Sequence, residues 1–496
     1  MAWPPSDFLR YKMLEHSAWY SGDANILSSF YSQSAELTLA GTKSVTKNLF
    51  WNRQHKDETC IAMRVPIAGD IASTSADILF GESPTVKIAE AHSTKATQSM
   101  KDTQIAVDTM LVDSGFFRKI VEAAETCSAI GGVYIKLAWD KELSPYPIPV
   151  VEQAENAYPE FKFGMLRSVS FVSILATEKG GSTVVRLVEI YSSDGSIRYE
   201  FYKGRADNLG EKIDLDDTEY GAEYQDITTG IKELLCVYVP NILPNRHNRN
   251  SYIGRSDFAG IEGLMHGLDE TYSSWMRDLI LARGKVLVPE EYLRKSRDGA
   301  FKFDLDTMIY DTMDVDPTVA GNQITSIQFE IRAEQFAKTS MELIERIVMS
   351  SGYSPQSFGI NIEGSATSGV ALNIRERKSF STKSKKEQYW EPALKKLVKL
   401  SMLIYKQQLS GKLDDSGTVT IQFADGSGTS LSEMASAVAQ ISNAIAASVD
   451  TKVRYLHPEW SEEQISIEVE LIIKENGLSP ELPDPEEFLD PNLEEK

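Results

Sequence analysis

The feature that most constrains this chain is a pair of long amphipathic segments on either side of an insertion, residues 284–326. In the first segment, from Ser256 to Arg283, apolar residues recur in alternating steps of three and four. This spacing, about 3.5 residues per turn, predicts a helix with one continuous apolar stripe. A second helix is predicted from Ile327 to Ser351. The stripe of the first helix comprises Phe258, Ile261, Met265, Leu268, Tyr272, Trp275 and Leu279.

The apolar face of the first helix is wider than one partner helix covers. Leu264, Met276 and Ile280 extend the stripe sideways. Two such helices, joined at one end by the insertion, can pack antiparallel against each other. The part of a broad apolar stripe that the partner helix does not cover must then be buried against something else. Neighbouring copies of the same hairpin satisfy this requirement, and a closed ring of hairpins makes a tube.

The rest of the sequence mixes helical and strand patterns, which predicts an α+β fold. Residues 1–60 look mostly helical, and alternating segments between residues 167 and 240 predict strands. The region 145–165 contains four prolines and is expected to be mostly loop. A polar helix after residue 369 is expected to bend or break near Pro392. From Ser430 the tail is predicted to be helical.

Charge and cysteine usage narrow the classes of function. The chain of 496 residues has 51 basic and 72 acidic side chains, so its net charge is −21. A protein that grips nucleic acid with its whole surface would be basic. The three cysteines have no zinc-like spacing and indicate free thiols. Neither a signal peptide nor a membrane span is expected, because no apolar run reaches about 18 residues.

No pattern in the sequence predicts catalysis or a cofactor. The six histidines form no close pair, and the chain has neither a phosphate-binding loop nor a nucleophile elbow. Five aspartates between Asp304 and Asp316 resemble a cation site, but they lack the glycine and final glutamate of an EF-hand loop. A solvated or partner-facing surface is the preferred interpretation. We therefore expect no catalytic residue, no metal and no cofactor.

Six segments in a fixed order together resemble the portal, or head-to-tail connector, proteins of tailed bacteriophages. The similarity covers roughly residues 1–430 and is greatest to the branch found in long-tailed phages of Gram-positive hosts. The segments that carry it are 18–23 (AWYSGD), 64–84, 128–140, 251–289, 303–314 and 351–359 (SGYSPQSFG).

The resemblance implies a structural protein rather than an enzyme: a ring, dodecameric in the family, at one vertex of the capsid. Double-stranded DNA passes through its channel during packaging and ejection. The implied partners are the terminase large subunit, a head-tail adaptor, and the major capsid and scaffolding proteins. The implied location is the virion, after assembly in the host cytoplasm.

The resemblance also divides the chain into a portal-type fold. It implies a mixed wing (1–250 and 369–429), stem helices (251–283 and 327–352), a small α/β clip (284–326), a channel loop (353–368) and a helical crown with an acidic tail (430–496). The clip would dock partners through Arg294, Lys295 and Arg297. The channel-loop residues would be Ser354, Pro355, Gln356, Ser357, Phe358, Gly359 and Asn361, with Phe358 either its tip or, as we prefer, its anchor.

One basic stretch stands out in the acidic chain, and two interpretations of it stay open. Its side chains either meet the DNA backbone or pair with acids of the same or an adjacent subunit. The second interpretation is preferred, because a channel through which DNA slides gains little from strong phosphate contacts. The residues are Arg375, Arg377, Lys378, Lys383, Lys385 and Lys386.

Two other classes of function remain as alternatives to the portal. One is a soluble α+β enzyme with a dispersed, unrecognised active site. The other is a soluble adaptor that binds another coiled coil through the first long helix. Both predict a monomer or a small oligomer, whereas a portal predicts a large ring.

Overall fold

The computed structural model describes most of the chain in two compact units. The described residues are 8–34, 63–89, 98–177, 183–205, 208–214, 224–282, 285–289, 310–313, 325–327, 331–360, 369–409, 411–424, 431–444, 446–457, 460 and 462–475. The first unit spans residues 1–366 and 371–424, and the second spans residues 367–370 and 425–496. Each unit is described by itself.

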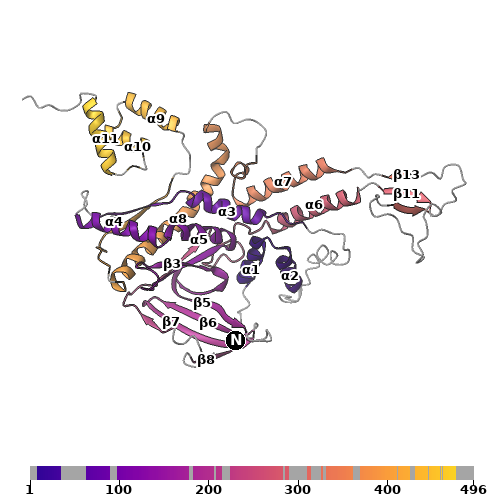
Figure 1. Cartoon of the computed structure of the whole chain (residues 1–496), viewed down its shortest axis with the longest axis horizontal. Helices are drawn as coiled ribbons and strands as arrows, with labels where there is room; N and C mark the ends of the chain where they lie inside the picture. Colours follow the sequence, from indigo (N-terminus) through magenta and orange to yellow (C-terminus); the bar gives the residue numbers. More distant parts are fainter. Residues whose placement is uncertain are drawn as a thin grey trace, which may run out of the picture. The chain divides into compact units, whose positions relative to one another are not determined.

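Helices from the first third of the chain build the core of the first unit (Figure 1). Helix α5 packs against α3 and against strands of the adjoining sheet. It buries one face at helical spacing, with Phe116, Ile120, Ala123 and Cys127 all inside. These helices are α1 (Phe8–Ser21), α2 (Ala24–Ser34), α3 (Ile67–Phe80), α4 (Gln98–Asp113) and α5 (Phe116–Ile130).

Three sheets complete the mixed part of the first unit. A buried sheet has the order β10-β2-β3, a larger one has the order β4-β5-β6-β7-β8 with β9 on β7, and β1 pairs with β14. A turn at Ser193–Gly195 joins β6 to β7. The strands are β1 (Thr85–Ala89), β2 (Gly132–Ala138), β3 (Ile148–Gln153), β4 (Ala157–Lys162), β5 (Met165–Thr177), β6 (Thr183–Ser192), β7 (Ser196–Arg205), β8 (Glu211–Ile213), β9 (Ile227–Thr228), β10 (Cys236–Pro240) and β14 (Thr418–Gln422).

The proline-rich region 145–165 is not mostly loop, so that expectation is wrong. It holds β3 and β4, joined by the short helix η2 (Ala154–Asn156). Pro149 lies in β3 and Pro159 in β4, and each strand is the last in its sheet. An edge strand tolerates proline, because the missing N–H leaves no ladder bond unmade on its open side.

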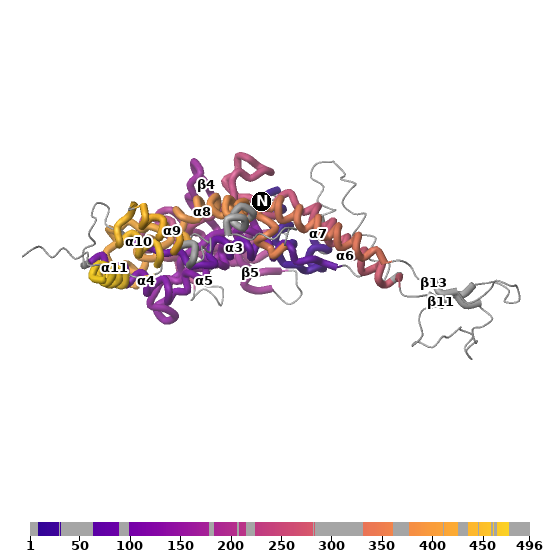
Figure 2. Tube along the Cα trace, turned by 90° about the horizontal axis from the view of Figure 1, so that it is seen from above, coloured from indigo at the N-terminus to yellow at the C-terminus, as the bar shows by residue number. Residues whose placement is uncertain are grey.

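Helices α6 (Glu262–Leu281) and α7 (Ala333–Ser351) form an antiparallel hairpin. Both views show them side by side (Figures 1 and 2). Arg332, just before α7, forms an ion pair of 2.7 Å with Asp278 near the end of α6. Between the helices in sequence, β11 (Lys285–Pro289) pairs parallel with β12 (Tyr310–Met313) and antiparallel with β13 (Thr325–Ile327).

Both helices of the hairpin start later than the sequence predicts. Residues 251–256 are irregular and residues 257–261 form turns. Ser256 does not cap α6, because its hydroxyl accepts from Phe258 N and donates to the Ala129 carbonyl. Ile327 belongs to β13 rather than to α7. The hydrogen bond from Ser256 to α5 and the pairing of Ile327 with Lys285 therefore take the place of the helical turns that were expected there.

Helix α8 (Gly369–Gln407) runs through Pro392 without the break that was one of the two expected outcomes. Proline removes the N–H that would bond the carbonyl four residues earlier, that of Gln388. Gln388 is exposed, so water can bond this carbonyl. Trp390, Ala393 and Leu394 around the proline are buried and hold the helix against the core.

The second unit is helical in its described part. It contains α9 (Leu431–Asn443), α10 (Val449–Leu456) and α11 (Glu462–Glu475). Ser448 caps α10 by accepting a hydrogen bond from Thr451 N. Helix α10 contacts both α9 and α11, so the described part of this unit is a small helical cluster.

Gly131, between α5 and β2, should tolerate no side chain. Its φ is 106°, and a Cβ there would lie 2.7 Å from Ser256 N. We expect Gly131→Ala to cost at least about 2 kcal/mol of unfolding free energy. Gly69→Ala in α3 is the matched control, because a Cβ there meets nothing within 4 Å. It should stabilise by about 0.5–1 kcal/mol. Urea denaturation measures both, and equal effects would contradict the packing at Gly131.

Candidate functional site

A fully buried ion pair lies where the α6–α7 hairpin meets the core. Lys386 Nζ, from α8, is 2.6 Å from Asp257 Oδ2, and the two side chains are 2% and 0% exposed. Asp257 lies in the turn that leads into α6. Two bare charges in this interior would be costly, so the pair depends on further hydrogen bonds.

Four other segments supply those hydrogen bonds. Ser128 Oγ of α5 and Tyr353 OH, just after α7, donate to Asp257 Oδ2 at 2.6 and 2.8 Å. Asn241 Nδ2 donates to Oδ1 at 2.8 Å. Lys386 Nζ also donates to Ser75 Oγ of α3 and to Tyr353 OH. The pair is therefore bonded on both sides, and it joins the start of α6, the end of α7 and three core helices at one point.

A second buried pair fixes α6 about two turns after its first residue. Asp269 Oδ2 accepts from Arg64 Nη1 at 2.8 Å, and its Oδ1 accepts from Val65 N at 2.9 Å. Burial raises the pKa of Asp269 to about 6, even though Arg64 and the Val65 amide oppose the shift. The contact ties α6 to the segment that precedes α3.

The first turn of α6 is also held by α1. Glu262 Oε1 lies 3.2 Å from His16 Nε2 and 3.3 Å from Lys12 Nζ. Its Oε2 accepts from Gly260 N at 2.8 Å. Burial alone would raise the pKa of Glu262, but the hydrogen bonds from His16 and from its own backbone, together with the charge on Lys12, hold it at about 2.

The predicted stripe is buried at one end of the hairpin and uncovered at the other. Phe258, Ile261, Met265 and Leu268 are fully buried in this chain, the first two in the turns before α6. Tyr272 and Trp275 are half-buried, and Leu279 is 39% exposed. The ring of Trp275 stacks on Phe336 of α7 at 6.1 Å. Along this stripe, the chain's own core covers only the half nearest the Lys386–Asp257 pair.

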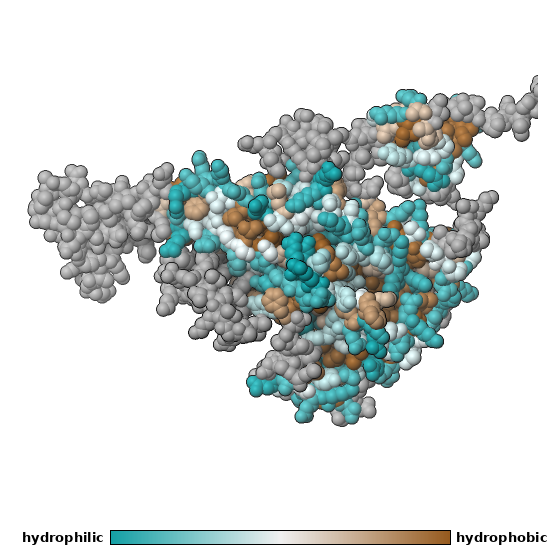
Figure 3. All heavy atoms as spheres, turned by 180° about the vertical axis from the view of Figure 1, so that it is seen from behind, coloured by the Kyte–Doolittle hydropathy of each residue, from teal (hydrophilic) through white to brown (hydrophobic). Residues whose placement is uncertain are grey.

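Other apolar side chains of the hairpin reach the surface. Ile331, Met341 and Met349 are 39%, 48% and 43% exposed. Hydrophobic patches interrupt the hydrophilic surface of the described part of the chain (Figure 3). A groove between α6 and α7, lined by residues such as Thr271, Arg332 and Phe336, separates the two helices near this surface.

The structure divides the six basic candidates of α8. Lys386 and Lys383 are buried, and Lys383 Nζ donates to the Ala424 carbonyl of the same chain. For these two, the DNA-facing interpretation is wrong, because their ammonium groups are bonded inside this chain. Arg377, Lys378 and Lys385 are exposed. The side chain of Arg375 lies outside the described residues.

The first half of the predicted channel loop is packed against the core. Ser354 and Pro355 are buried, and Gln356, Ser357 and Phe358 are half-buried in or beside the short helix η5 (Pro355–Phe358). Phe358 packs edge-on against Tyr353, with the ring centroids 6.3 Å apart. Gly359 is exposed. Asn361 lies outside the described residues, as do the clip residues Arg294, Lys295 and Arg297.

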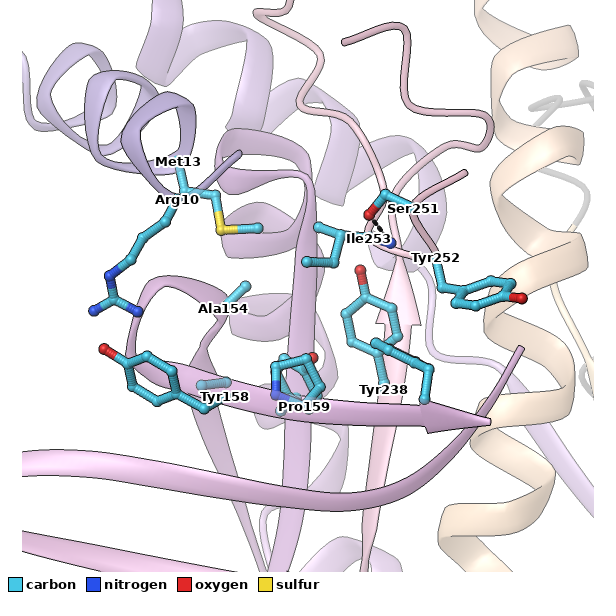
Figure 4. A pocket seen from close by; sticks show the side chains of 12 residues that line it. Arg10, Met13, Ala154, Tyr158, Pro159, Tyr238, Ser251, Tyr252 and Ile253 are labelled. Carbon is cyan, nitrogen blue, oxygen red and sulfur yellow. Dashed lines mark hydrogen bonds between the residues drawn. The ribbon is translucent and has the colours of Figure 1, made fainter. Parts of the chain in front are cut away.

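A cavity of about 360 Å³ lies between α1, β4 and the buried sheet. Arg10 and Met13 descend from α1, and Tyr158 and Pro159 stand on β4 below them (Figure 4). Among the described residues that line it, Arg10 is the one charged side chain, and its guanidinium lies 4.6 Å above the Tyr158 ring. The full lining is Arg10, Met13, Tyr134, Ala154, Ala157, Tyr158, Pro159, Phe161, Tyr238, Ser251, Tyr252 and Ile253.

Neither a metal cluster nor a membrane helix is found in the described part of the chain. No group of three or more His, Cys, Asp or Glu side chains there could hold a metal ion. No helix there combines the length and apolar character needed to cross a bilayer. Cys127 and Cys236 are buried free thiols, and Cys60 lies outside the described residues.

Sequence reasoning missed Asp257, Ser128 and Tyr353 as parts of a site. Each is a common residue in an ordinary segment, and their partners lie about a hundred or more residues away. The one sequence signal for these contacts was the helical spacing of three polar residues, which places them on one face of a helix. These residues are Ser379, Thr382 and Lys386.

Comparison with known proteins assigns the family. The family model for phage portal proteins of the SPP1 Gp6-like type matches residues 10–455. The chain therefore belongs to this family of phage portal proteins. The family is structural rather than enzymatic, and it places the chain in the portal or head-tail connector of a phage-like virion.

Two solved structures are among those that match this chain. One is a chain from the neck of an empty GTA particle, computed with C6 symmetry, with 11% identity and a TM-score of 0.44. The match covers 79% of this chain and 90% of that one. The other is a chain from the virion of a native gene transfer agent particle, with 12% identity, a TM-score of 0.41, and coverage of 80% and 91%. No curated protein matches the sequence.

Removing the buried ammonium should leave Asp257 charged and unpaired. We expect Lys386→Met to lower the free energy of unfolding by about 3–5 kcal/mol. The neighbouring exposed Lys385→Met is the matched control and should change it by less than about 0.5 kcal/mol. Urea denaturation monitored by circular dichroism compares the two. A difference below about 1 kcal/mol would show that the pair is not sealed from water.

Glu262 should make stability sensitive to acid. Its pKa is lower in the folded chain, about 2, than the ordinary value of 4.5. The ionised form therefore stabilises the fold above pH 4.5, and this contribution is lost as the pH falls towards 2. After allowance for solvent screening, we expect about 1–3 kcal/mol. Glu262→Gln should flatten the acid limb of a stability–pH profile, and the exposed Glu270→Gln should not. Identical profiles would count against the contact.

Proposed function

We propose that this chain assembles into a closed ring, with double-stranded DNA passing through its channel during packaging and ejection. The family match over residues 10–455 carries the proposal. The family resemblance supplies its finer content: twelve copies at one capsid vertex, in a long-tailed phage of a Gram-positive host. In this assignment, α6 and α7 are the stem helices that surround the channel.

The uncovered half of the hairpin supports assembly through this surface. Leu279, Met341 and Met349 are each between 39% and 48% exposed in the single chain. Taking a fully exposed side chain of this size out of water contributes about 1.5–3 kcal/mol, so covering the part that is still exposed contributes roughly 1 kcal/mol for each residue. Copies arranged around an axis bring α6 and α7 of adjacent subunits together. Each copy then covers the apolar residues that the core of its neighbour leaves open.

The acidic composition suits a conduit for DNA. At −21 per copy, a ring presents net negative charge to phosphate groups. A strongly basic wall would bind the backbone tightly and hold it in place. We infer that the channel wall avoids strong phosphate contacts, so that DNA slides past it.

In this proposal, the segments outside the two stem helices make the contacts with partners and with DNA. The insertion between α6 and α7, residues 284–326, is the clip. The terminase large subunit docks there first, and the head-tail adaptor docks there later. The candidate contact residues are Arg294, Lys295 and Arg297. The segment that begins at Tyr353 lines the channel. The remaining mixed region is the wing, which meets capsid and scaffolding proteins, and the C-terminal helices are the crown.

Ring formation is the decisive test. A charge on the stripe should block subunit packing, so we expect Trp275→Asp and Leu279→Asp to give monomers or small oligomers. Arg277→Asp introduces the same side chain at an exposed position of α6 and should leave full rings. Native mass spectrometry and electron micrographs of purified protein report the size of the assembly.

Leu279→Asp also controls for folding. Because Leu279 is 39% exposed, this variant should retain the helical circular dichroism of the parent while failing to assemble. Full rings from both stripe variants would overturn the stem assignment. A parent chain that remains monomeric at every concentration would overturn the ring itself.

A further inference from the structure

One face of α8 holds the segment that follows α7. The residues on this face lie at helical spacing, and each bonds a different point of that segment. Thr382 Oγ1 donates to the Gly352 carbonyl at 2.6 Å, and Lys378 Nζ donates to the Met349 carbonyl. These two contacts bond carbonyl groups at the end of α7, which the helix itself leaves without donors.

Ser379 bonds the start of the candidate channel loop. Its Oγ accepts from Ser354 N at 2.9 Å and lies 2.8 Å from Ser357 Oγ. Ser379 and Ser354 are 2% and 3% exposed, so water does not compete for this contact. One hydroxyl therefore bonds both ends of the turn from Ser354 to Ser357.

Lys386, two turns after Ser379, completes the same face. Its Nζ donates to Tyr353 OH at 2.9 Å, and the same atom pairs with Asp257. The contact between α8 and the candidate loop is thus continuous with the buried ion pair at the start of α6.

Two glycines mark where this contact begins and ends. Gly352 and Gly359 both have positive φ, of 109° and 71°. A Cβ on Gly352 would lie 3.2 Å from Thr382 Oγ1, whereas one on Gly359 would meet nothing within 4 Å. The chain is therefore packed against α8 from Gly352 to Ser357 and is open at Gly359.

We propose that Ser379, Thr382 and Lys386 are positioning residues that clamp the segment Gly352–Ser357 to α8. They determine how the start of the candidate channel loop, from Gly352 to Ser357, is held on the core. The role of this segment in the channel rests on the proposed function, but the clamp itself does not. The contacts are polar and directional, so they fix the register of the segment on α8, which apolar packing alone would leave free to slide.

The clamp also explains why this helix looks polar all round in sequence. The serine, threonine and lysine side chains that resemble a solvated surface are the buried face of α8. Arg377, Lys378 and Lys385 remain exposed. Among the six basic candidates, Arg377 and Lys385 are the described exposed ones outside this contact, because the Lys378 ammonium bonds the Met349 carbonyl.

Removing one hydroxyl tests the clamp in the full-length chain. Ser379→Ala leaves the buried Ser354 amide without its acceptor. Such a loss corresponds to roughly tenfold to a hundredfold faster opening. Hydrogen exchange read by mass spectrometry should show this increase in peptides that cover residues 353–358. Thr382→Val, which removes the donor to Gly352 with little change in shape, should act in the same direction.

Ser401→Ala is the matched control. Ser401 is a buried serine of the same helix, 4% exposed, but its hydroxyl donates to Leu397 of its own helix. This variant should leave exchange at 353–358 unchanged. The clamp is overturned if Ser379→Ala does not speed exchange there, or if Ser401→Ala speeds it equally.

A second measurement separates the clamp from the channel. DNA retained in packaged particles should fall in Ser379→Ala if the clamped segment lines the channel. Faster exchange with unchanged DNA retention supports the clamp and counts against the channel role. Unchanged exchange overturns the clamp, whatever the particles retain.

Discussion

The Lys386–Asp257 pair is the interaction on which the rest of the structure depends. Taking two charges out of water costs several kcal/mol each, and only excellent geometry offsets it. Asp257 accepts from Lys386, Ser128, Tyr353 and Asn241, so its lone pairs are used from several directions. The origin of α6, the end of α7 and the core helices can meet in one arrangement only. If the hairpin packs against its neighbours in a ring as proposed, it needs such a fixed base, because an error in angle would grow along its length.

The hairpin was largely predictable from the sequence, whereas its base was not. The regular spacing from Met265 to Leu279 is a local pattern, and the structure places these residues on one helix. Its start was misjudged because Ser256 and Asp257 bond to α5 instead of capping α6. Counting charges along α8 identified a basic stretch but could not reveal that Lys383 and Lys386 point inwards. Their partners are remote in sequence, and no periodic rule connects them.

The same limit explains the misjudged proline region. Proline is a local signal for loops, and its acceptance in β3 and β4 depends on those strands lying at sheet edges. Edge position is a property of the assembled sheet. Pro392 is similar, since α8 continues through it where the exposed Gln388 can give its carbonyl to water. In each case the residue keeps its intrinsic preference, and the surroundings remove the penalty.

The sequence separations within the buried pair have a consequence for the order of folding. Lys386 and Asp257 are 129 residues apart, and Lys386 and Ser75 are 311 apart. Contacts of such long range form late, because the loop-closure entropy must be overcome before they stabilise anything. During synthesis from the N-terminus, α6 and α7 emerge before α8 does. The hairpin therefore cannot acquire its fixed base until α8 has left the ribosome. If the stripe packs subunits together as proposed, this delay keeps an incomplete chain from presenting a correctly aimed stripe to other copies while it is still being made.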